Sequence, residues 1–401
     1  MTEKIKILRI INRFNLGGPT FNAAYLTKYI GDEFETLLIG GEKDETEESS
    51  TFILDSLDLT PTIIPEMKRE IGFKEDKIAY KKLKDIIKEF QPDIVHTHAS
   101  KAGTLGRMAA YKCKVPVIVH TFHGHVFHSY FGKTKTIFYK NIERFLAKKS
   151  TKIVAISEIQ KKELTIQHKI CDKSKVAIVS LGFDLSRFQE DYELKRNDFR
   201  KHYLLEEDEI AIGIIGRLVP IKNHTLFLEA INQLLKKSTK KVRVFIVGDG
   251  EEKENLIQHC RELKLDVTEF NQHKKKAIIT FTSWIKNIDW ANAGLDIIAL
   301  SSLNEGTPVS LIEAQAANNP IVTTNVGGVE NVVLKDKTGF IVSSGNNQAF
   351  SEALLKLVEN DVLRKKMGEK GWEFVKEKFH YERLVDDMRQ LYFSLLENNK
   401  K

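Results

Sequence analysis

Residues 295–314 read LDIIALSSLNEGTPVSLIEA. Its opening residues 295–300, apolar except for Asp296, predict a buried strand, and the apolar run after the loop predicts a helix that ends near Ala317. Thr307 is a favoured N-cap, and Pro308 suits the first helical position because its missing N–H has no partner there. A strand that leads through a short loop into a helix is typical of a parallel α/β sheet.

Two glutamates, Glu305 and Glu313, stand eight positions apart in this stretch. Glu305 falls on the loop before the predicted helix, and Glu313 falls in the second helical turn. Between them, the free N–H groups and the partial positive charge of the helix N-terminus suit a phosphate. An acidic loop followed by a solvated helical glutamate is the alternative interpretation. The small and apolar residues around the pair favour a ligand site.

Length and composition predict a soluble protein of two domains. The chain has 401 residues, which is enough for two domains of about 200 residues each. Its 42% apolar and 29% charged residues are typical of globular proteins, and no apolar run reaches the ~20 residues that span a bilayer. Residues 4–10 alternate like a first strand, so we expect no secretory signal. Three scattered cysteines fit neither a disulfide framework nor a zinc site, which favours a reduced, cytoplasmic protein.

Positive charge is concentrated in the first half of the chain. The net charge is +7, and residues 94–182 hold 16 Lys and Arg against four Asp and Glu. This asymmetry predicts an anionic partner, which could be a membrane surface, a nucleic acid or a phosphorylated substrate. Solvated helix faces are the alternative explanation. The basic residues do not form a recognised nucleic-acid-binding module, so we expect no nucleic acid.

Short β-rich runs alternate with helical stretches in both halves, which predicts an α/β fold with two doubly wound parallel sheets. The strands are expected at residues 5–11, 36–39, 94–97, 115–121, 153–156, 176–179, 210–215, 242–247, 277–281, 295–300, 321–323 and 339–342. The clearest helices are expected at 77–90, 136–149, 347–359, 361–378 and 381–397. The polar segment 189–208 is interpreted as a linker between domains 1–188 and 209–378.

Two common phosphate-binding motifs are missing from the sequence. The first strand leads into NLGGPT at residues 15–20, a glycine pair rather than G-x-G-x-x-G, and no G-x-x-x-x-G-K-[ST] occurs. Both absences argue against a dinucleotide-dependent oxidoreductase and against an ATPase. Arg217 and Lys222 instead follow the strand 210–215, where open α/β sheets bind ligands. A guanidinium fork and an ammonium suit a diphosphate, although two surface cations are the alternative.

These pieces together resemble the retaining glycosyltransferases of family 4, which have the GT-B arrangement of two facing Rossmann-like domains. The resemblance spans nearly the whole chain and rests on the order and spacing of its motifs. They are the Gly17-Gly18 loop, DIVHTH at 93–98, TFHG at 121–124, SLGFD at 180–184, Gly216-Arg217 with Lys222, VGDG at 247–250, the Glu305 and Glu313 pair, and TNVGG at 324–328.

The resemblance implies a role for each matching residue. The expected catalytic residues are His123, Arg217, Lys222 and Glu305. The expected donor-binding residues are Gly17, Gly18, Arg217, Lys222, Gly248, Ser283, Trp284, Ile285, Glu305, Gly306, Thr307, Pro308, Val309 and Glu313. In this assignment Arg217 and Lys222 neutralise the donor diphosphate, Glu305 binds the transferred sugar, and Glu313 binds the ribose. His98 and His125 are expected to contact the acceptor.

The implied reaction needs neither a metal nor another cofactor. Family members substitute on one face of the sugar, and the leaving phosphate accepts the proton of the incoming hydroxyl. The histidines at 96, 98, 120, 123, 125 and 128 offer a zinc site as an alternative. Because they fall on strand ends and a glycine loop, we expect donor and acceptor contacts by His123 and its neighbours instead.

The resemblance also implies what the enzyme acts on. The donor is expected to be a nucleotide sugar, with UDP favoured, and the acceptor a lipid-linked or other oligosaccharide bound by domain 1–188. Aromatic and basic residues interleave over 124–149, which suits an anionic membrane surface, although ordinary amphipathic helices share the pattern. We therefore expect a peripheral enzyme at the inner face of the plasma membrane that builds a capsule, O-antigen or similar polysaccharide. The C-terminal helix at 379–401 is expected to pack on domain 1–188.

Two alternatives from other classes stay open at this point. A nucleotide-sugar 2-epimerase has the same two-domain architecture and needs no acceptor. A non-catalytic nucleotide-sugar-binding protein could use the same diphosphate site without turnover.

Overall fold

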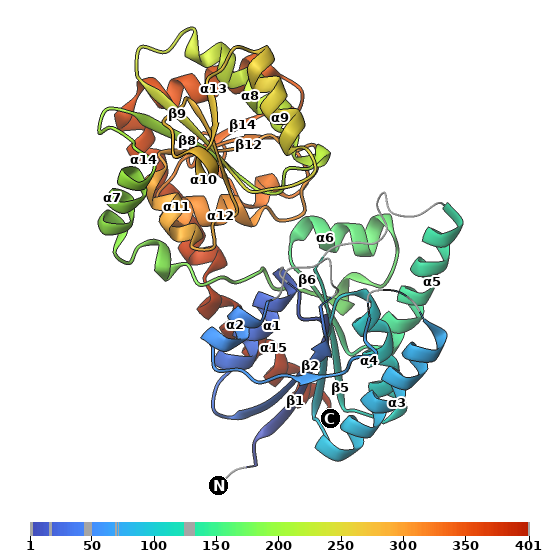
Figure 1. The fold of residues 1–401 in the computed structure, drawn as a ribbon. Coiled ribbons are helices and arrows are strands. Elements are labelled where there is room, and N and C mark those ends of the chain that lie inside the picture. Colours follow the sequence, from blue (N-terminus) through green and yellow to red (C-terminus); the bar gives the residue numbers. More distant parts are fainter. Residues whose placement is uncertain are drawn as a thin grey trace. The chain divides into compact units, whose positions relative to one another are not determined.

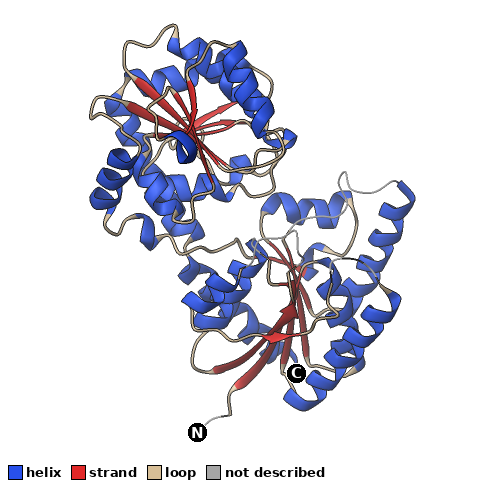
Figure 2. Ribbon diagram, viewed as in Figure 1, coloured by secondary structure: helices blue, strands red, loops and turns tan. Residues whose placement is uncertain are grey.

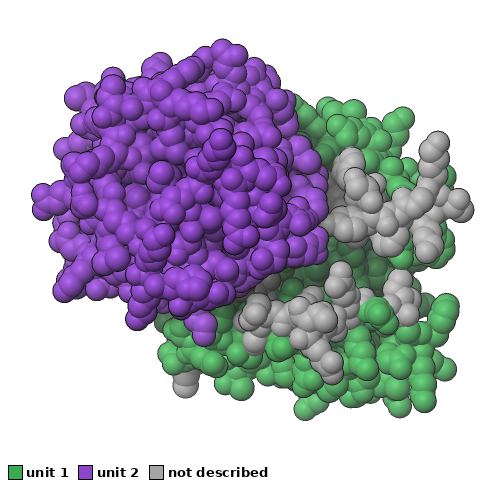
Figure 3. All heavy atoms as spheres, turned by 45° about the horizontal axis from the view of Figure 1, so that its top comes forward, with its two compact units in different colours: residues 1–183, 379–401 green, residues 184–378 purple. Residues whose placement is uncertain are grey.

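The structure is a computed structural model that describes residues 3–15, 18–43, 50–68, 70, 72–123 and 133–399, with backbone alone for 133–135. The chain divides into two compact units (Figure 3). Unit 1 comprises Met1–Phe183 with Phe379–Lys401, and unit 2 comprises Asp184–Lys378. In each unit helices cover both faces of a parallel sheet (Figures 1 and 2), which confirms the predicted α/β class.

Unit 1 has a seven-stranded sheet in the order β3-β2-β1-β4-β5-β6-β7. Every described pair in it is parallel, as the helical connections between successive strands require. Its strands are β1 (Ile5–Arg13), β2 (Phe34–Gly41), β3 (Thr62–Ile63), β4 (Ile94–His98), β5 (Val117–Phe122), β6 (Lys152–Ala155) and β7 (Val176–Ile178). Its helices are α1 (Gly18–Tyr29), α2 (Thr51–Ser56), α3 (Phe73–Phe90), α4 (Ser100–Lys112), α5 (Lys133–Lys149), α6 (Glu158–Lys162) and α15 (Tyr381–Asn399).

Unit 2 repeats this architecture with the strand order β10-β11-β9-β8-β12-β13-β14, again parallel. Its strands are β8 (Ile210–Ile215), β9 (Val242–Val247), β10 (Val267–Glu269), β11 (Ile279–Ser283), β12 (Ile297–Leu300), β13 (Ile321–Thr324) and β14 (Gly339–Val342). Its helices are α7 (Tyr192–His202), α8 (His224–Leu235), α9 (Lys253–Glu262), α10 (Phe270–His273), α11 (Ile288–Gly294), α12 (Val309–Ala316), α13 (Asn347–Glu359) and α14 (Asp361–Phe379).

The pleat of β1 explains how unit 1 builds a core on each side of its sheet. Ile7 packs in a cluster with Met388 of α15, whereas Leu8 packs in a cluster with Leu83 of α3 on the other face. Fully burying one such side chain contributes roughly 1.5–3 kcal/mol. Because the apolar face of α15 covers this sheet, the last residues of the chain belong to unit 1.

The segment 189–208, which its polar composition presents as a linker, contains helix α7 and lies in unit 2. Phe199 of α7 is fully buried, and its ring lies 4.9 Å from the Trp290 ring and 5.4 Å from the Phe245 ring. Most other residues of α7 face solvent, which is why the composition hides a helix that is docked on one side.

Helix α12 begins one residue later than its cap residues predict. The prediction that Thr307 is its N-cap is wrong, because Pro308 holds the cap position with φ −72° and ψ 95°. The extended ψ of Pro308 delays the first helical residue to Val309. The two short strands β3 and β10 were not predicted either. They have two and three residues, which is too short to show an alternation of apolar and polar residues.

Each sheet has a switch point, where the strand order reverses beside the first strand of the unit, and this is where open α/β sheets bind ligands. In unit 1 the change falls between β1 and β4, so His98 and the start of α1 lie at the switch point. In unit 2 it falls between β8 and β12, whose carboxyl ends lead to Arg217 and to Glu305.

Candidate functional site

The centre of the unit 2 site is an ion pair between Lys222 and Glu305. Lys222 Nζ lies 2.6 Å from Glu305 Oε1, and the Ser302 hydroxyl donates to the same oxygen at 2.6 Å. The Ser301 hydroxyl donates to the main-chain oxygens of Lys222 and Asn223 and thereby fixes the loop after β8 to the loop after β12. The two expected catalytic side chains therefore meet at the switch point.

The loop after β13 holds Glu305 from the other side. The Gly328 N–H donates to the Glu305 carbonyl at 3.1 Å. Gly327 has φ +49°, and a Cβ on it would lie 1.8 Å from the Glu305 carbonyl oxygen. Only glycine permits this contact, so the glycine pair of the sequence motif is a support for the glutamate loop.

Two further expected donor contacts face open space. Arg217 is exposed, and its side chain makes no hydrogen bond or ion pair with another described residue. A Cβ added to Gly306, next to the start of α12, would meet nothing within 4 Å. An unengaged guanidinium, the Lys222 ammonium and a helix start thus occur on neighbouring loops, which is a suitable set for a diphosphate.

Glu313 lies in the second turn of α12 and is one fifth exposed. Burial raises the pKa of Glu313 to about 7, Arg187 opposes this shift, and Asp289 adds to it. Arg187 Nη2 lies 3.8 Å from Glu313 Oε1, too far for a hydrogen bond. The carboxylate therefore keeps its hydrogen-bonding capacity for another group.

The expected base-binding segment lies at the end of β11. Ser283 has φ +58°, and its hydroxyl donates to Asp249 Oδ2 at 2.8 Å. The Gly248 N–H donates to the Ser283 carbonyl at 3.1 Å, which joins this segment to the loop after β9. The Trp284 side chain beyond it is 53% exposed, so it offers an aromatic surface to a planar ligand.

The unit 1 site consists of histidines at the ends of β4 and β5. His98 Nδ1 and His123 Nε2 share a hydrogen bond of 2.8 Å, and the two rings stack at 5.1 Å. Among the described residues, His98 Nε2 and His123 Nδ1 have no partner although both atoms are buried. Burial lowers the pKa of His123 to about 3 and holds that of His98 well below its usual range. The pair is neutral at pH 7.

This neutral pair has a definite chemical consequence. Whichever ring donates the shared proton, one of the two outer nitrogens carries a hydrogen and the other carries a lone pair. The pair therefore presents one donor and one acceptor, which suits the hydroxyl groups of a sugar.

Some predicted residues cannot be placed. Gly17 and His125 lie outside the described residues, whereas Gly18 is the first residue of α1. No three His, Cys, Asp or Glu side chains of the described chain converge as metal ligands would.

Sequence reasoning missed Ser302, which bonds Glu305, and Arg187, which faces Glu313. No local pattern marks either residue. It also missed Arg9, for which a signal was present: a charged residue in the middle of an apolar strand.

Comparisons with known proteins find similarity to glycosyltransferases in both halves of the chain. The family profile "Glycosyl transferases group 1" matches residues 195–374, and "Glycosyltransferase Family 4" matches residues 37–187. A UDP-Gal:alpha-D-GlcNAc-diphosphoundecaprenol alpha-1,3-galactosyltransferase of Escherichia coli is 30% identical over 337 residues, 84% of each chain. The capsular polysaccharide biosynthesis glycosyltransferase CapM of Staphylococcus aureus is 28% identical over 341 residues, 84% of this chain and 86% of that protein.

A solved structure agrees with the fold. The chain superposes on Anabaena Alr3699/HepE in complex with UDP with a TM-score of 0.78 at 17% identity, covering 97% of this chain and 100% of that one. A likeness at this identity concerns the fold alone.

Proposed function

We propose that this chain, which belongs to the retaining glycosyltransferases of family 4 and has their GT-B fold, moves a hexose or N-acetylhexosamine from a UDP-sugar to a lipid-linked saccharide. The observation that carries the proposal is the Lys222–Glu305 pair at the unit 2 switch point, beside the start of α12. The two relatives named above support a role in surface polysaccharide assembly.

The hard step of glycosyl transfer is the departure of the diphosphate while positive charge develops on the sugar. In our proposal Arg217, Lys222 and the N–H groups at the start of α12 stabilise the leaving diphosphate. Losing one such preorganised donor typically costs ~2.7–4 kcal/mol in the transition state. The leaving phosphate takes the proton of the incoming hydroxyl, so no side chain needs to act as a nucleophile.

The two glutamates have separate roles in this proposal. Glu305 binds hydroxyls of the transferred sugar after the diphosphate has attracted Lys222 away from it. Glu313 binds the ribose hydroxyls, for which its carboxylate has unused lone pairs. Ser283, Trp284 and Ile285 hold the base next to Gly248. His98 and His123 bind sugar hydroxyls from unit 1.

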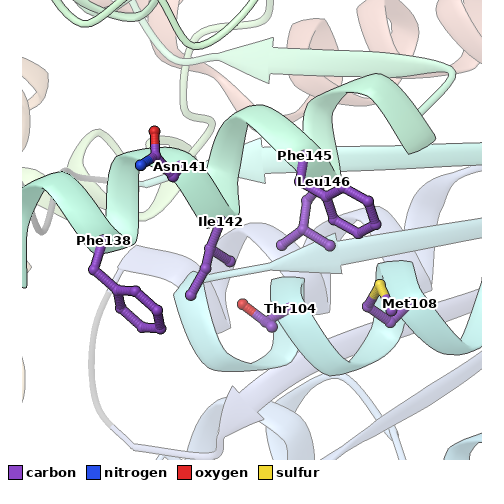
Figure 4. A pocket seen from close by; sticks show the side chains of 7 residues that line it. All are labelled: Thr104, Met108, Phe138, Asn141, Ile142, Phe145 and Leu146. Carbon is purple, nitrogen blue, oxygen red and sulfur yellow. The ribbon is translucent and has the colours of Figure 1, made fainter.

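An apolar groove in unit 1 supports the proposal that the acceptor is lipid-linked. The groove has a volume of about 440 Å³ and lies between α4 and α5. In Figure 4 the side chains of Phe138, Ile142, Phe145 and Leu146 extend from α5 toward Thr104 and Met108 of α4. Phe138 is 62% exposed and Phe145 49%, so their rings are available to a lipid.

The exposed charges described on α4 and α5 are all positive. The exposed residues Lys112 and Lys148 lie on α4 and α5, and the only acid of the two helices, Glu143, is buried against Arg107 at 2.7 Å. Cations beside an apolar surface attract anionic lipid head groups, with about 1 kcal/mol for each nearby basic residue. None of the described helices is long and apolar enough to cross a bilayer. The apolar groove and the exposed lysines beside it support peripheral attachment at the inner face of the plasma membrane.

The proposal is tested by a turnover screen over nucleotide sugars, with and without lipid-linked acceptors, read by mass spectrometry. We expect one UDP-sugar to give an acceptor heavier by one sugar, and the NMR spectrum of that product to show the anomeric configuration retained. An epimerase of the same fold would instead release free epimerised sugar without acceptor. A protein that binds UDP-sugars but turns none over would contradict the enzymatic proposal.

A further inference from the structure

Arg9 is a buried cation without an acidic partner. It lies in the middle of β1, its exposed fraction is 0%, and it forms no ion pair with any described residue. Its Nε donates to Thr27 Oγ1 at 3.1 Å, and its Nη2 donates to the Leu26 carbonyl at 3.4 Å. A buried charge without a counter-ion costs several kcal/mol, so an apolar residue at this core position would give a more stable sheet. This cost points to a role beyond stability.

The third nitrogen of Arg9 determines the state of His96. Nη1 lies 3.1 Å from His96 Nδ1 and 3.2 Å from the Tyr392 hydroxyl, which is itself 2.6 Å from the same Nδ1. A guanidinium only donates, so His96 Nδ1 must accept. The Tyr392 hydroxyl then accepts from Arg9 and donates to His96. In this arrangement the Arg9 and Tyr392 hydrogens share the single lone pair of His96 Nδ1, and the Tyr392 oxygen accepts from Arg9.

The proton of His96 is thereby placed on its other nitrogen. His96 Nε2 lies 2.7 Å from Thr121 Oγ1 and donates to it. A second proton on Nδ1 would displace both donors and put an imidazolium beside Arg9. Burial and the Arg9 charge both hold the pKa of His96 well below its usual range. His96 is therefore a neutral ring with one fixed tautomer.

His96 in turn forms the surface on which the His98–His123 pair rests. The His96 and His98 ring centroids lie 4.2 Å apart with the planes tilted by 34°, and the His98 and His123 rings stack at 5.1 Å, so the three imidazoles form a continuous series of ring contacts. Thr121, which accepts from His96, lies on β5 two residues before His123. A change in the orientation of His96 is transmitted to the pair through ring contact and through β5.

We propose that Arg9 and Tyr392 are positioning residues for the sugar-binding pair His98 and His123. They fix the tautomer and orientation of His96, and His96 orients the pair. The catalytic consequence rests on the proposed function, whereas the tautomer of His96 does not. The proposal also gives the C-terminal helix a part in the reaction, because Tyr392 lies on α15.

The test uses the full chain and variants at both positions. Tyr392→Phe removes one hydroxyl and keeps the ring that packs in the core. Arg9→Met removes the cation and keeps much of the apolar stem, and Arg9→Lys restores the charge. Val385→Ala is the matched control, because Val385 packs in the same cluster from α15 and touches no histidine through a hydrogen bond.

The first readout is ¹⁵N NMR of the imidazoles without substrate, with His96 assigned by its substitution. We expect the Nε2–H tautomer of His96 from pH 5 to 8 in the unaltered chain, and mixed tautomers in Arg9→Met. Arg9→Lys should restore the single tautomer. An Nδ1–H or cationic His96 in the unaltered chain would overturn the proposal whatever the protein catalyses.

The second readout is steady-state transfer. We expect Tyr392→Phe to lower kcat about fivefold, the change expected from one lost ordinary hydrogen bond, and Arg9→Met to lower it further. The KM for the UDP-sugar should change less than twofold, and Val385→Ala should change only the melting temperature. If Tyr392→Phe and Arg9→Met behave like Val385→Ala, both residues are merely structural. If the unaltered chain transfers no sugar, the proposed function is contradicted. The NMR result on the His96 tautomer does not depend on that outcome.

Discussion

Lys222 Nζ and Glu305 Oε1 lie 2.6 Å apart although the two residues are separated by 83 positions and follow different strands. They meet because β8 and β12 are neighbours in the sheet, so the loops at their carboxyl ends converge. The free protein thus neutralises the cation with the carboxylate. In the proposed function a donor diphosphate replaces the carboxylate as the partner of Lys222 and releases Glu305 for the sugar.

Replacing Lys222 should remove stabilisation of the leaving group. We expect Lys222→Ala to lower kcat about 10²–10³-fold, because one preorganised donor is lost. The measurement is steady-state UDP release with saturating acceptor. Arg196→Met is a matched control, because the Arg196–Asp296 pair has similar burial but lies at the amino ends of the same two strands. Equal losses in both variants would assign the effect to stability.

Gly306 should be needed for the ligand and not for the fold. A methyl group on Gly306 meets no atom within 4 Å, so we expect Gly306→Ala to keep the melting temperature and to raise the KM for the donor. Gly327→Ala supplies the contrast, because its Cβ would lie 1.8 Å from the Glu305 carbonyl oxygen and the variant should be destabilised. Unchanged donor affinity in Gly306→Ala would place the donor elsewhere.

The raised pKa of Glu313 predicts how the stability of the folded chain depends on pH. Its pKa is raised from 4.5 to about 7 in the folded chain, so folding takes up a proton between these values. Its contribution to stability is complete below pH 4.5 and is lost as pH rises through 7. Glu313→Gln should therefore be more stable than the unaltered chain at pH 8, by no more than about 3 kcal/mol, and equal to it at pH 4.5.

Denaturant unfolding of both proteins at the two pH values measures this difference. A variant that is less stable at pH 8 would show that Arg187 already compensates the buried carboxylate. The same variant should bind the donor more weakly at pH 8, where Glu313 is a carboxylate, because an amide holds the ribose hydroxyls less strongly than a carboxylate does.

The groove between α4 and α5 should matter only for lipid acceptors. We expect Phe145→Ser to weaken binding to vesicles of anionic phospholipid and to raise the KM for a long-chain acceptor. Turnover with a soluble short-chain acceptor should stay within twofold. Flotation with neutral vesicles and at high salt separates the apolar from the electrostatic contribution. Salt-insensitive binding, or equal loss with both acceptors, would contradict the assigned role.

Buried strands were the most predictable part of the fold. The predicted limits of β8, β9 and β14 coincide with the structure, since each is a largely apolar run that begins directly after a polar residue. Helix α7 was concealed because Phe199 is its only buried apolar side chain and Arg200 its only other buried residue. Sequence periodicity cannot distinguish such a helix from a linker.

The site was predictable where the family motifs are local and not where partners come from far along the chain. The Lys222–Glu305 contact depends on strand order, which the motifs imply but do not state. Arg187 lies 126 positions before Glu313, and Tyr392 lies 296 positions after His96, so only the packed structure brings them together.

We propose that the Lys222–Glu305 pair serves sugar transfer from a UDP-sugar to a lipid-linked saccharide. The most direct test is mass spectrometry of a single turnover with the preferred UDP-sugar and a polyprenyl-diphosphate saccharide, for the unaltered chain, Lys222→Ala and Arg196→Met. We predict a product heavier by one sugar for the unaltered chain and Arg196→Met, and product formation at least 10²-fold slower for Lys222→Ala. Transfer at an unchanged rate in properly folded Lys222→Ala would contradict the claim.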